Sequence, residues 1–316
     1  MRRYIPTLTI GPILAVLVAA PIFVILWTAF KPTGLVRDPG FTLQNFREVY
    51  GDPELLGILT TTVVFAAGST LCTILIAVPI AWLIERTDLP ASGLFRGIVI
   101  LPMATPALLL AIAWTMLLNP TTGVFNDLLG GLPGGINLNI YSLWGMIFVE
   151  ALASVPTAFL IIAPALRATD PALEEAAQMC GASLATILRR VTIPLAMPAI
   201  LAAATFLTIA GFVVFDVPGI LGLPGNEVVL STNIYRLAKR SQTGLPLYGQ
   251  IGALVLVVLL VLGVLAWFYR RATRHSSKFA TLTGKGYRPR RLPLGRWKDA
   301  AVGGSTGYFT LAVVAP

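Results

Sequence analysis

The chain has 316 residues, of which 56% are hydrophobic and only 12% are charged, and its mean hydropathy is +0.81. A soluble domain carries about twice that share of charged residues, so the composition excludes a soluble globular protein and indicates an integral membrane protein. The net charge of +9 is concentrated in residues 270–302. Because no stacking platform or nucleic-acid motif accompanies this charge, we expect it to fix topology and to touch anionic lipid headgroups, with no nucleic acid as a partner.

Apolar segments long enough to cross a bilayer recur along the chain. Roughly 20 apolar residues are needed to cross about 30 Å of hydrocarbon. The sequence therefore predicts an all-α polytopic membrane protein with six transmembrane helices, at about 8–30, 58–84, 94–118, 141–166, 194–216 and 250–269. Several of these spans contain proline, at Pro79, Pro102, Pro106, Pro156 and Pro198. Neighbouring helices shelter the backbone groups that proline leaves unpaired, so we expect kinked helices in one bundle.

The basic residues predict the orientation in the membrane. Most of the 23 Lys and Arg residues fall in segments that are cytoplasmic if the N-terminus is inside. The fifth loop is the exception, since Arg236, Lys239 and Arg240 lie on the opposite face, but charges in a long loop are less decisive. The first apolar run reaches Phe30. It is longer than a signal-peptide core, so we expect it to remain as a membrane span.

Residues 167–193, between the fourth and fifth spans, have the pattern of a short helix. Asp170 is a good N-cap and Pro171 suits the first helical position. Glu174 and Glu175 follow early enough to favour the positive end of the helix dipole. Leu173, Ala176, Ala177 and Cys180 then repeat at helical spacing and predict an exposed face of small side chains.

Gly181 is expected to end this first helix. Ser183 can then cap a second short helix, which would close at Arg189 and Arg190 before Pro194 returns the chain to the membrane. Two short helices bent at a glycine would form a compact projection that is joined to two membrane spans and can transmit motion.

The spacing in this segment resembles a known signature. The signature consists of Glu175-Ala176-Ala177, Gly181, Val191, Ile193 and Pro194. It resembles the cytoplasmic loop of type I ABC importer permeases, the inner-membrane components of binding-protein-dependent transport systems. The resemblance covers essentially the whole chain. Val191 and Ile193 stand where the family usually has Ile and Leu.

The resemblance implies a division of labour among several partners. An external solute-binding protein delivers solute, two permease halves form the path, and a cytoplasmic ABC ATPase dimer drives it. Residues 167–193 would then be the coupling loop, with Glu174, Glu175, Ala176, Ala177 and Gly181 docking into the ATPase. The chain would be no enzyme and would bind no cofactor. Gly284-Lys285-Gly286 lacks the Ser or Thr of a phosphate-binding loop.

Other stretches resemble one branch of this family, and they indicate which solute is transported and how long the whole protein is. The branch is that of permeases for ferric iron, polyamines, thiamine and related small polar solutes, and the resemblance lies in residues 41–46, 81–90, 101–102 and Pro106. Residues 279–290 resemble the mid-chain linker of fused ferric-iron permeases. We therefore expect a ferric-iron permease of a bacterial-type inner (plasma) membrane, with a polyamine, thiamine or other small polar solute as the alternative.

The end of the chain resembles the first span begun again. Residues 311–316 repeat the pattern of residues 14–21, so residues 303–316 are expected to start a further span of a second permease half beyond Pro316. The expected organisation is a six-span half at 1–269, a basic cytoplasmic linker at 270–302 and this further span. A short interfacial tail is the alternative.

Two acidic residues are candidates for the solute path. Glu150 lies in the fourth span and Asp216 near the external end of the fifth. A carboxylate in hydrocarbon should face the bundle interior or a wet cavity; the alternative is a structural acid at a helix junction. The sequence shows no catalytic constellation and no metal-ligand spacing. A secondary transporter driven by an ion gradient would be expected to carry more buried titratable groups, and it remains the alternative from another class.

Overall fold

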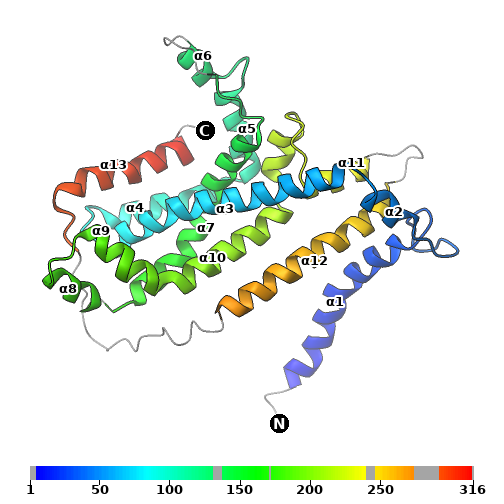
Figure 1. The fold of residues 1–316 in the computed structure, drawn as a ribbon, viewed down its shortest axis with the longest axis horizontal. Coiled ribbons are helices and arrows are strands. Elements are labelled where there is room, and N and C mark those ends of the chain that lie inside the picture. Colours follow the sequence, from blue (N-terminus) through cyan, green and yellow to red (C-terminus); the bar gives the residue numbers. More distant parts are fainter. Residues whose placement is uncertain (1–4, 131–136, 171, 240–245, 274–291, 315–316) are drawn as a thin grey trace. The chain divides into compact units, whose positions relative to one another are not determined.

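The computed structural model describes residues 5–130, 137–170, 172–239, 246–273 and 292–314, and within them the chain is helical without a β-strand. The all-α prediction is therefore confirmed. Residues 279–290, which carry the linker resemblance, and Pro171 lie outside the described residues. In chain order (Figure 1) the elements are α1 Ile5–Ala29, α2 Gln44–Tyr50, α3 Glu54–Arg86, α4 Ser92–Ile100, η1 Leu101–Ala104, α5 Ala107–Leu118, α6 Val124–Gly130, α7 Leu143–Ala168, α8 Ala172–Met179, α9 Leu184–Ile187, η2 Leu188–Thr192, α10 Ile193–Val213, η3 Pro218–Gly222, α11 Leu230–Lys239, α12 Tyr248–Thr273, η5 Gly295–Trp297, α13 Lys298–Phe309 and η6 Thr310–Val314.

Among the described residues, four helices are long and apolar enough to cross a membrane. They are Glu54–Arg86, Leu143–Ala168, Leu184–Val213 and Tyr248–Arg271, and a bent pair, Ser92–Ala104 with Ala107–Leu118, makes up to five. The first predicted span corresponds to α1, in which Val16–Ala29 forms a shorter apolar helix. These elements are consistent with the six predicted spans.

The chain divides into two compact units. The first unit contains residues 1–60 and 228–264, and the second contains residues 61–227 and 265–316. In the first unit, the buried amide of Asn45 donates hydrogen bonds to the carbonyls of Ala29 and Lys31, both at 2.9 Å. These bonds satisfy carbonyls that the end of α1 leaves without helical partners. Tyr50 Oη likewise donates to the Ala253 carbonyl of α12 at 3.0 Å.

Lys31 organises the loop that follows α1. Its ammonium group donates to the carbonyls of Asp38 and Gly40 at 3.0 and 3.2 Å, and it lies 4.9 and 4.4 Å from the ring centroids of Trp27 and Phe41. Two carbonyl acceptors and two aromatic faces offset the cost of burying this charge. Phe41 and Asn45 belong to the stretch 41–46 that carried part of the family resemblance, and both have structural contacts here.

In the second unit, α7 packs against α10, and both lie close to α3 (Figure 1). Small residues permit this approach: a Cβ on Gly211 of α10 would lie 3.0 Å from the Cα of Ala66 on α3. Thr73 Oγ1 donates to the Ala151 carbonyl of α7 at 3.3 Å, and Thr208 Oγ1 donates to Thr70 Oγ1 at 3.2 Å. Close backbones and interhelical hydroxyl bonds are the usual means of holding helices together in lipid.

The third predicted span is broken. Its two parts meet at 93°, and Thr105 between them is extended, with φ −97° and ψ 122°. Pro106 forces this conformation because its ring disfavours a helical residue directly before it. The predicted proline kink is thus a sharp bend at this position.

The segment after Ser183 differs from the sequence prediction. We expected a second short helix that ends at Arg189 and Arg190, but α9, η2 and α10 form one continuous helix, Leu184–Val213. Pro194 is tolerated because η2 is a π-turn, in which Ile193 N–H donates to the carbonyl of Leu188. The wider turn makes room for the proline ring, which would clash with a carbonyl four residues earlier.

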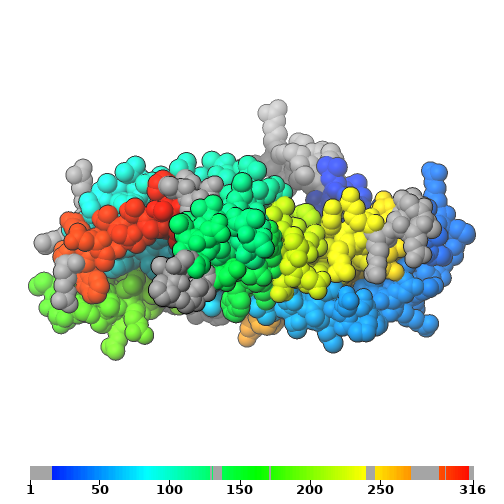
Figure 2. Space-filling model, turned by 90° about the horizontal axis from the view of Figure 1, so that it is seen from above, coloured from blue at the N-terminus to red at the C-terminus, as the bar shows by residue number. Residues whose placement is uncertain are grey.

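The helix formed by α13 and η6 lies against α4, η1 and α7, and its orange-to-red surface is visible in Figure 2. Ala301, Ser305, Tyr308 and Ala312 are buried. They recur at helical spacing, so one face of this helix packs on the second unit.

The close approach of α10 and α3 gives a stability prediction. Gly211→Val should lower the thermal unfolding midpoint of the detergent-solubilised protein, because overpacking of this kind costs about 1–3 kcal/mol. Gly97→Val is the matched control, since a Cβ on Gly97 of α4 meets no atom within 4 Å. Equal midpoints for the two variants would show that the contact at Ala66 does not limit stability.

Candidate functional site: the coupling loop and its anchor

Helix α8 of the coupling loop begins and ends as its local sequence predicts. Asp170 Oδ1 accepts from the Ala172 N–H at 2.9 Å. At the other end Gly181 has φ +79°, the Gly181 N–H donates to the Gln178 carbonyl, and the Ala182 N–H donates to the Ala177 carbonyl. This pair of bonds is a Schellman motif, which needs the left-handed residue that glycine supplies. Ser183 then caps α9, because its Oγ accepts from the Thr186 N–H at 3.3 Å.

The two acids of α8 have different surroundings. Glu174 is buried, with 3% of its surface exposed, and its carboxylate pairs with Arg86 at the end of α3 through an Nη2–Oε2 distance of 2.7 Å. Thr192 Oγ1 in η2 also donates to Glu174 Oε1 at 2.7 Å. Glu174 therefore points into the second unit, whereas Glu175 is half-buried.

Arg86 connects the coupling loop to a third helix. Its Nη1 donates to the carbonyls of Leu166 and Thr169 at 3.4 and 3.2 Å. These carbonyls lie at the C-terminal end of α7, where helical partners are missing. One guanidinium thus joins the end of α3, the end of α7 and the start of α8, and Glu174 extends the network to η2.

The residues next to Arg86 form ion pairs and hydrogen bonds with further parts of the second unit. Glu85 Oε2 pairs with Arg96 of α4 at 2.9 Å and with Arg167 of α7 at 3.4 Å. Thr87 forms a bridge with Leu292, and Asp88 accepts from the Leu294 N–H at 2.8 Å and pairs with Lys298 at 3.3 Å. Four consecutive residues at the end of α3 therefore form one anchor, Glu85 to Asp88.

The remaining predicted residues of the coupling loop lie nearer to the surface. Ala176 and Pro194 are exposed, and Ala177, Val191 and Ile193 are half-buried. Leu173 and Met179 of α8 are 47% and 89% exposed. The predicted exposed face exists, but it is more apolar than we expected, because Met179 was not recognised from the sequence.

The two path candidates occupy different environments in the second unit. Glu150 is buried in α7, where its Oε1 accepts from Ser154 Oγ at 3.2 Å. Its Oε2 has no hydrogen-bond partner among the described residues. Asp216 is exposed between α10 and η3. Among the described residues, no group of three or more His, Cys, Asp or Glu has the arrangement of a metal site.

Sequence reasoning did not recognise the anchor as functional. Residues 81–90 served only as a family resemblance, although four polar residues directly after an apolar span were a usable signal. The partner of Arg86 could not be found in this way, because Glu174 lies 88 positions further along the chain.

Comparisons with known proteins agree with this architecture. A family model described as "Binding-protein-dependent transport system inner membrane component" matches residues 77–274. A probable ABC transporter permease protein of Brucella abortus biovar 1 is 30% identical over 244 residues, which cover 74% of this chain and 82% of that protein. The trehalose/maltose transport system permease protein MalF of Thermococcus litoralis is 26% identical over 246 residues, covering 74% and 83% of the two chains.

A solved structure has the same fold. A chain in the crystal structure of a bacterial alginate ABC transporter in complex with an alginate pentasaccharide-bound periplasmic protein superposes with a TM-score of 0.69 and 22% identity. The match covers 89% of this chain and 98% of that one.

The buried ion pair gives the second prediction. Arg86→Met should destabilise the protein by about 3–5 kcal/mol, because it leaves the Glu174 carboxylate buried without a cation. Adding Glu174→Met should recover most of this loss, since an apolar pair of similar volume can replace a buried ion pair. Thermal unfolding in detergent measures both effects.

Arg167→Met is the control for this prediction. Arg167 is half-exposed, and its partner Glu85 keeps Arg96, so the loss should stay within about 1 kcal/mol. If Arg86→Met and Arg167→Met unfold at the same temperature, the buried pair does not hold α8 to α3.

A third prediction concerns pH and the attachment of residues 292–298. The Leu294 N–H that donates to Asp88 holds the pKa of this carboxyl below its usual value. The ionised carboxylate of Asp88 therefore stabilises the attachment, and its full contribution is present at pH values above the ordinary aspartate pKa of about 4. This contribution is lost as the pH falls through the lowered folded-state pKa. Hydrogen exchange at the amides of 292–298, corrected for intrinsic rates, should therefore accelerate on acidification. In Asp88→Asn this acceleration should be absent, and an unchanged pH dependence would contradict the assignment to Asp88.

Proposed function

This chain belongs to the family of binding-protein-dependent transport system inner membrane components, and we propose that it is driven by a cytoplasmic ABC ATPase that docks on the coupling loop. As a member of the family it is the membrane permease subunit of an ABC importer, in which the ATPase is a separate subunit. Membership of this family argues against the alternative of a carrier driven by an ion gradient.

The observation that carries the docking proposal is the connection of α8 to the membrane helices. Glu174 joins α8 to α3 through Arg86 and to η2 through Thr192. A force on α8 is therefore transmitted to several spans through these side-chain contacts, without a flexible loop between them. The exposed Leu173 and Met179 offer apolar surface on the outer side of α8, which is suited to burial against a partner.

The division of roles within α8 follows from burial. Glu174 points inward and binds the anchor through Arg86, while Glu175, Ala176, Ala177 and Gly181 form the docking surface. ATP-driven closure of the ATPase can favour one state of the permease only through contacts that differ between the two states. A rigid α8 supplies such contacts, and Val191, Ile193 and Pro194 continue the loop into α10.

The path and the second half of the permease belong to the same proposal. A second permease half completes the path. Glu150 and Asp216 face this path, where a buried carboxylate with an unpartnered oxygen can interact with polar solute. An external binding protein delivers the solute, and the N-terminus lies on the ATPase side.

Two cargoes have separate support. The names of the relatives mention trehalose, maltose and maltodextrin, and the similar solved transporter imports alginate, which favours a saccharide. The resemblance of residues 279–290 to the linker of ferric-iron permeases favours ferric iron. Polyamines and thiamine have only the branch resemblance in their favour.

One capture experiment separates these cargoes. The complex is isolated from mildly solubilised membranes through this chain and analysed by native mass spectrometry, and the binding protein that copurifies is titrated calorimetrically with maltose, trehalose and ferric citrate. Binding of one of these ligands assigns the cargo class. An intact complex that holds no ATPase would contradict the proposed function itself.

The fourth prediction tests docking. Gly181→Pro should leave membrane insertion intact but lower ATP-dependent uptake about ten-fold or more, because proline cannot adopt φ +79° and cannot donate the bond to Gln178. Glu175→Arg should have a similar effect by reversing a charge on the docking surface. Uptake into proteoliposomes with the complete complex is the measurement.

Glu54→Arg is the matched control, because Glu54 also lies in the first turn of a helix, α3, and is exposed. Normal uptake in all three variants would remove the coupling loop from the mechanism.

A further inference from the structure

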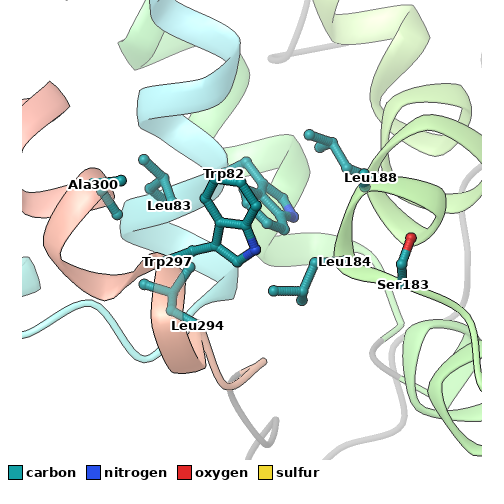
Figure 3. A pocket seen from close by; sticks show the side chains of 10 residues that line it. Trp82, Leu83, Ser183, Leu184, Leu188, Leu294, Trp297 and Ala300 are labelled. Carbon is teal, nitrogen blue, oxygen red and sulfur yellow. The ribbon is translucent and has the colours of Figure 1, made fainter.

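An apolar groove of about 540 Å³ lies in the second unit, beside the anchor (Figure 3). Trp82 and Leu83 of α3 form one wall, Leu184 and Leu188 form the opposite wall, and Leu294 and Trp297 close the third side. In Figure 3 the indoles of Trp82 and Trp297 overlap in the centre of the view, with Leu184 and Leu188 to their right. The described part of the chain leaves this groove open to the exterior.

The groove lies at the end of membrane-spanning helices. Trp82 is four residues before the last residue of α3, Arg86, and Leu184 is the first residue of the continuous helix Leu184–Val213. Tryptophan is enriched at this depth, where one end of the indole contacts hydrocarbon and the other meets polar groups. The position therefore gives access to lipid.

One wall of the groove contains an unsatisfied hydrogen-bond donor. Trp82 is 7% exposed, and its Nε1–H has no acceptor among the described residues. A buried donor without a partner costs free energy, so an occupant that supplies an acceptor is favoured over a purely hydrocarbon one.

The rim of the groove carries charges of both signs. Lys298, next to Trp297, is 44% exposed on its side chain and pairs with Asp88. Arg189 is exposed and follows the groove residue Ala185 by four positions, which places it on the same side of the helix. The exposed Asp299 directly follows Lys298, so two cations lie beside two carboxylates, and the cations can bind the phosphate of a phospholipid headgroup.

We propose that this groove binds one phospholipid, with an acyl chain between Trp82 and the leucines of the continuous helix, an ester carbonyl that accepts from Trp82 Nε1–H, and the phosphate of the headgroup beside Lys298 and Arg189. The three parts of such a lipid match the apolar walls, the unpartnered donor and the charged rim. A protein helix would fill the walls equally well, but it has no free carbonyl to offer the indole unless it is broken there. The lipid is in contact with both the coupling loop and the end of α3.

Photolabelling tests this directly. The complete complex in nanodiscs receives phosphatidylglycerol with a photoreactive diazirine on one acyl chain, and the labelled peptides are identified by mass spectrometry. Labels should fall on the peptides that contain Trp82, Leu184 to Leu188 and Trp297. Ala185→Trp, which fills the groove, should remove most of this label.

Two tryptophan variants provide the matched comparison. Trp82→Phe removes the donor and keeps an aromatic ring, so retention of the lipid should fall about five-fold, the value of one hydrogen bond. Trp114→Phe removes the other buried indole N–H without a partner among the described residues, but Trp114 of α5 does not line the groove, so labelling should be unchanged.

Equal labelling of the groove peptides in Ala185→Trp and in the unmodified protein would overturn the proposal. Labelling that avoids these peptides in the intact complex, with the groove cross-linked to another subunit, would show a protein interface and would overturn it as well. Neither ATP nor cargo is needed for labelling, so a failure of the docking or cargo proposals leaves this result interpretable.

Discussion

The buried ion pair between Arg86 and Glu174 is the constraint on which the coupling loop depends. Both side chains are almost fully removed from solvent, and neither charge could stay there alone, because an unpaired buried charge costs several kcal/mol. Arg86 is fixed to α3, and Glu174 is fixed to α8. The two helices therefore cannot separate without exposing or breaking the pair, and Thr192 and the terminal carbonyls of α7 are drawn into the same network.

Neighbouring residues extend this constraint to other helices. Glu85 holds α4 and α7 through two arginines, and Asp88 holds residues 294 and 298. The Schellman motif at Gly181 and the π-turn before Pro194 then fix the path between α8 and α10. Polar contacts at the end of α3 therefore hold α8 and the neighbouring helices together in an otherwise apolar chain.

Features governed by local rules could be predicted from the sequence. Asp170, Gly181 and Ser183 have the capping roles that their residue types indicated, and Pro106 bends the third span as expected. Features that depend on residues far away in the sequence could not be predicted in this way. The inward direction of Glu174 depends on Arg86, and the continuity of the helix through Pro194 depends on a π-turn that no residue pattern marks. The choice between saccharide and ferric iron is open for a related reason, since the fold is shared by permeases for different solutes.

The central claim is that α8 touches the ATPase while it is held to α3 from behind. The most direct measurement is cross-linking from Cys180, an exposed free cysteine directly after α8, in the complete complex with a short thiol-to-amine reagent. The account predicts a cross-link to the ATPase subunit, whose yield changes between ATP-bound and nucleotide-free states. A cross-link to the external binding protein, or none to an ATPase that is present in the complex, would contradict it.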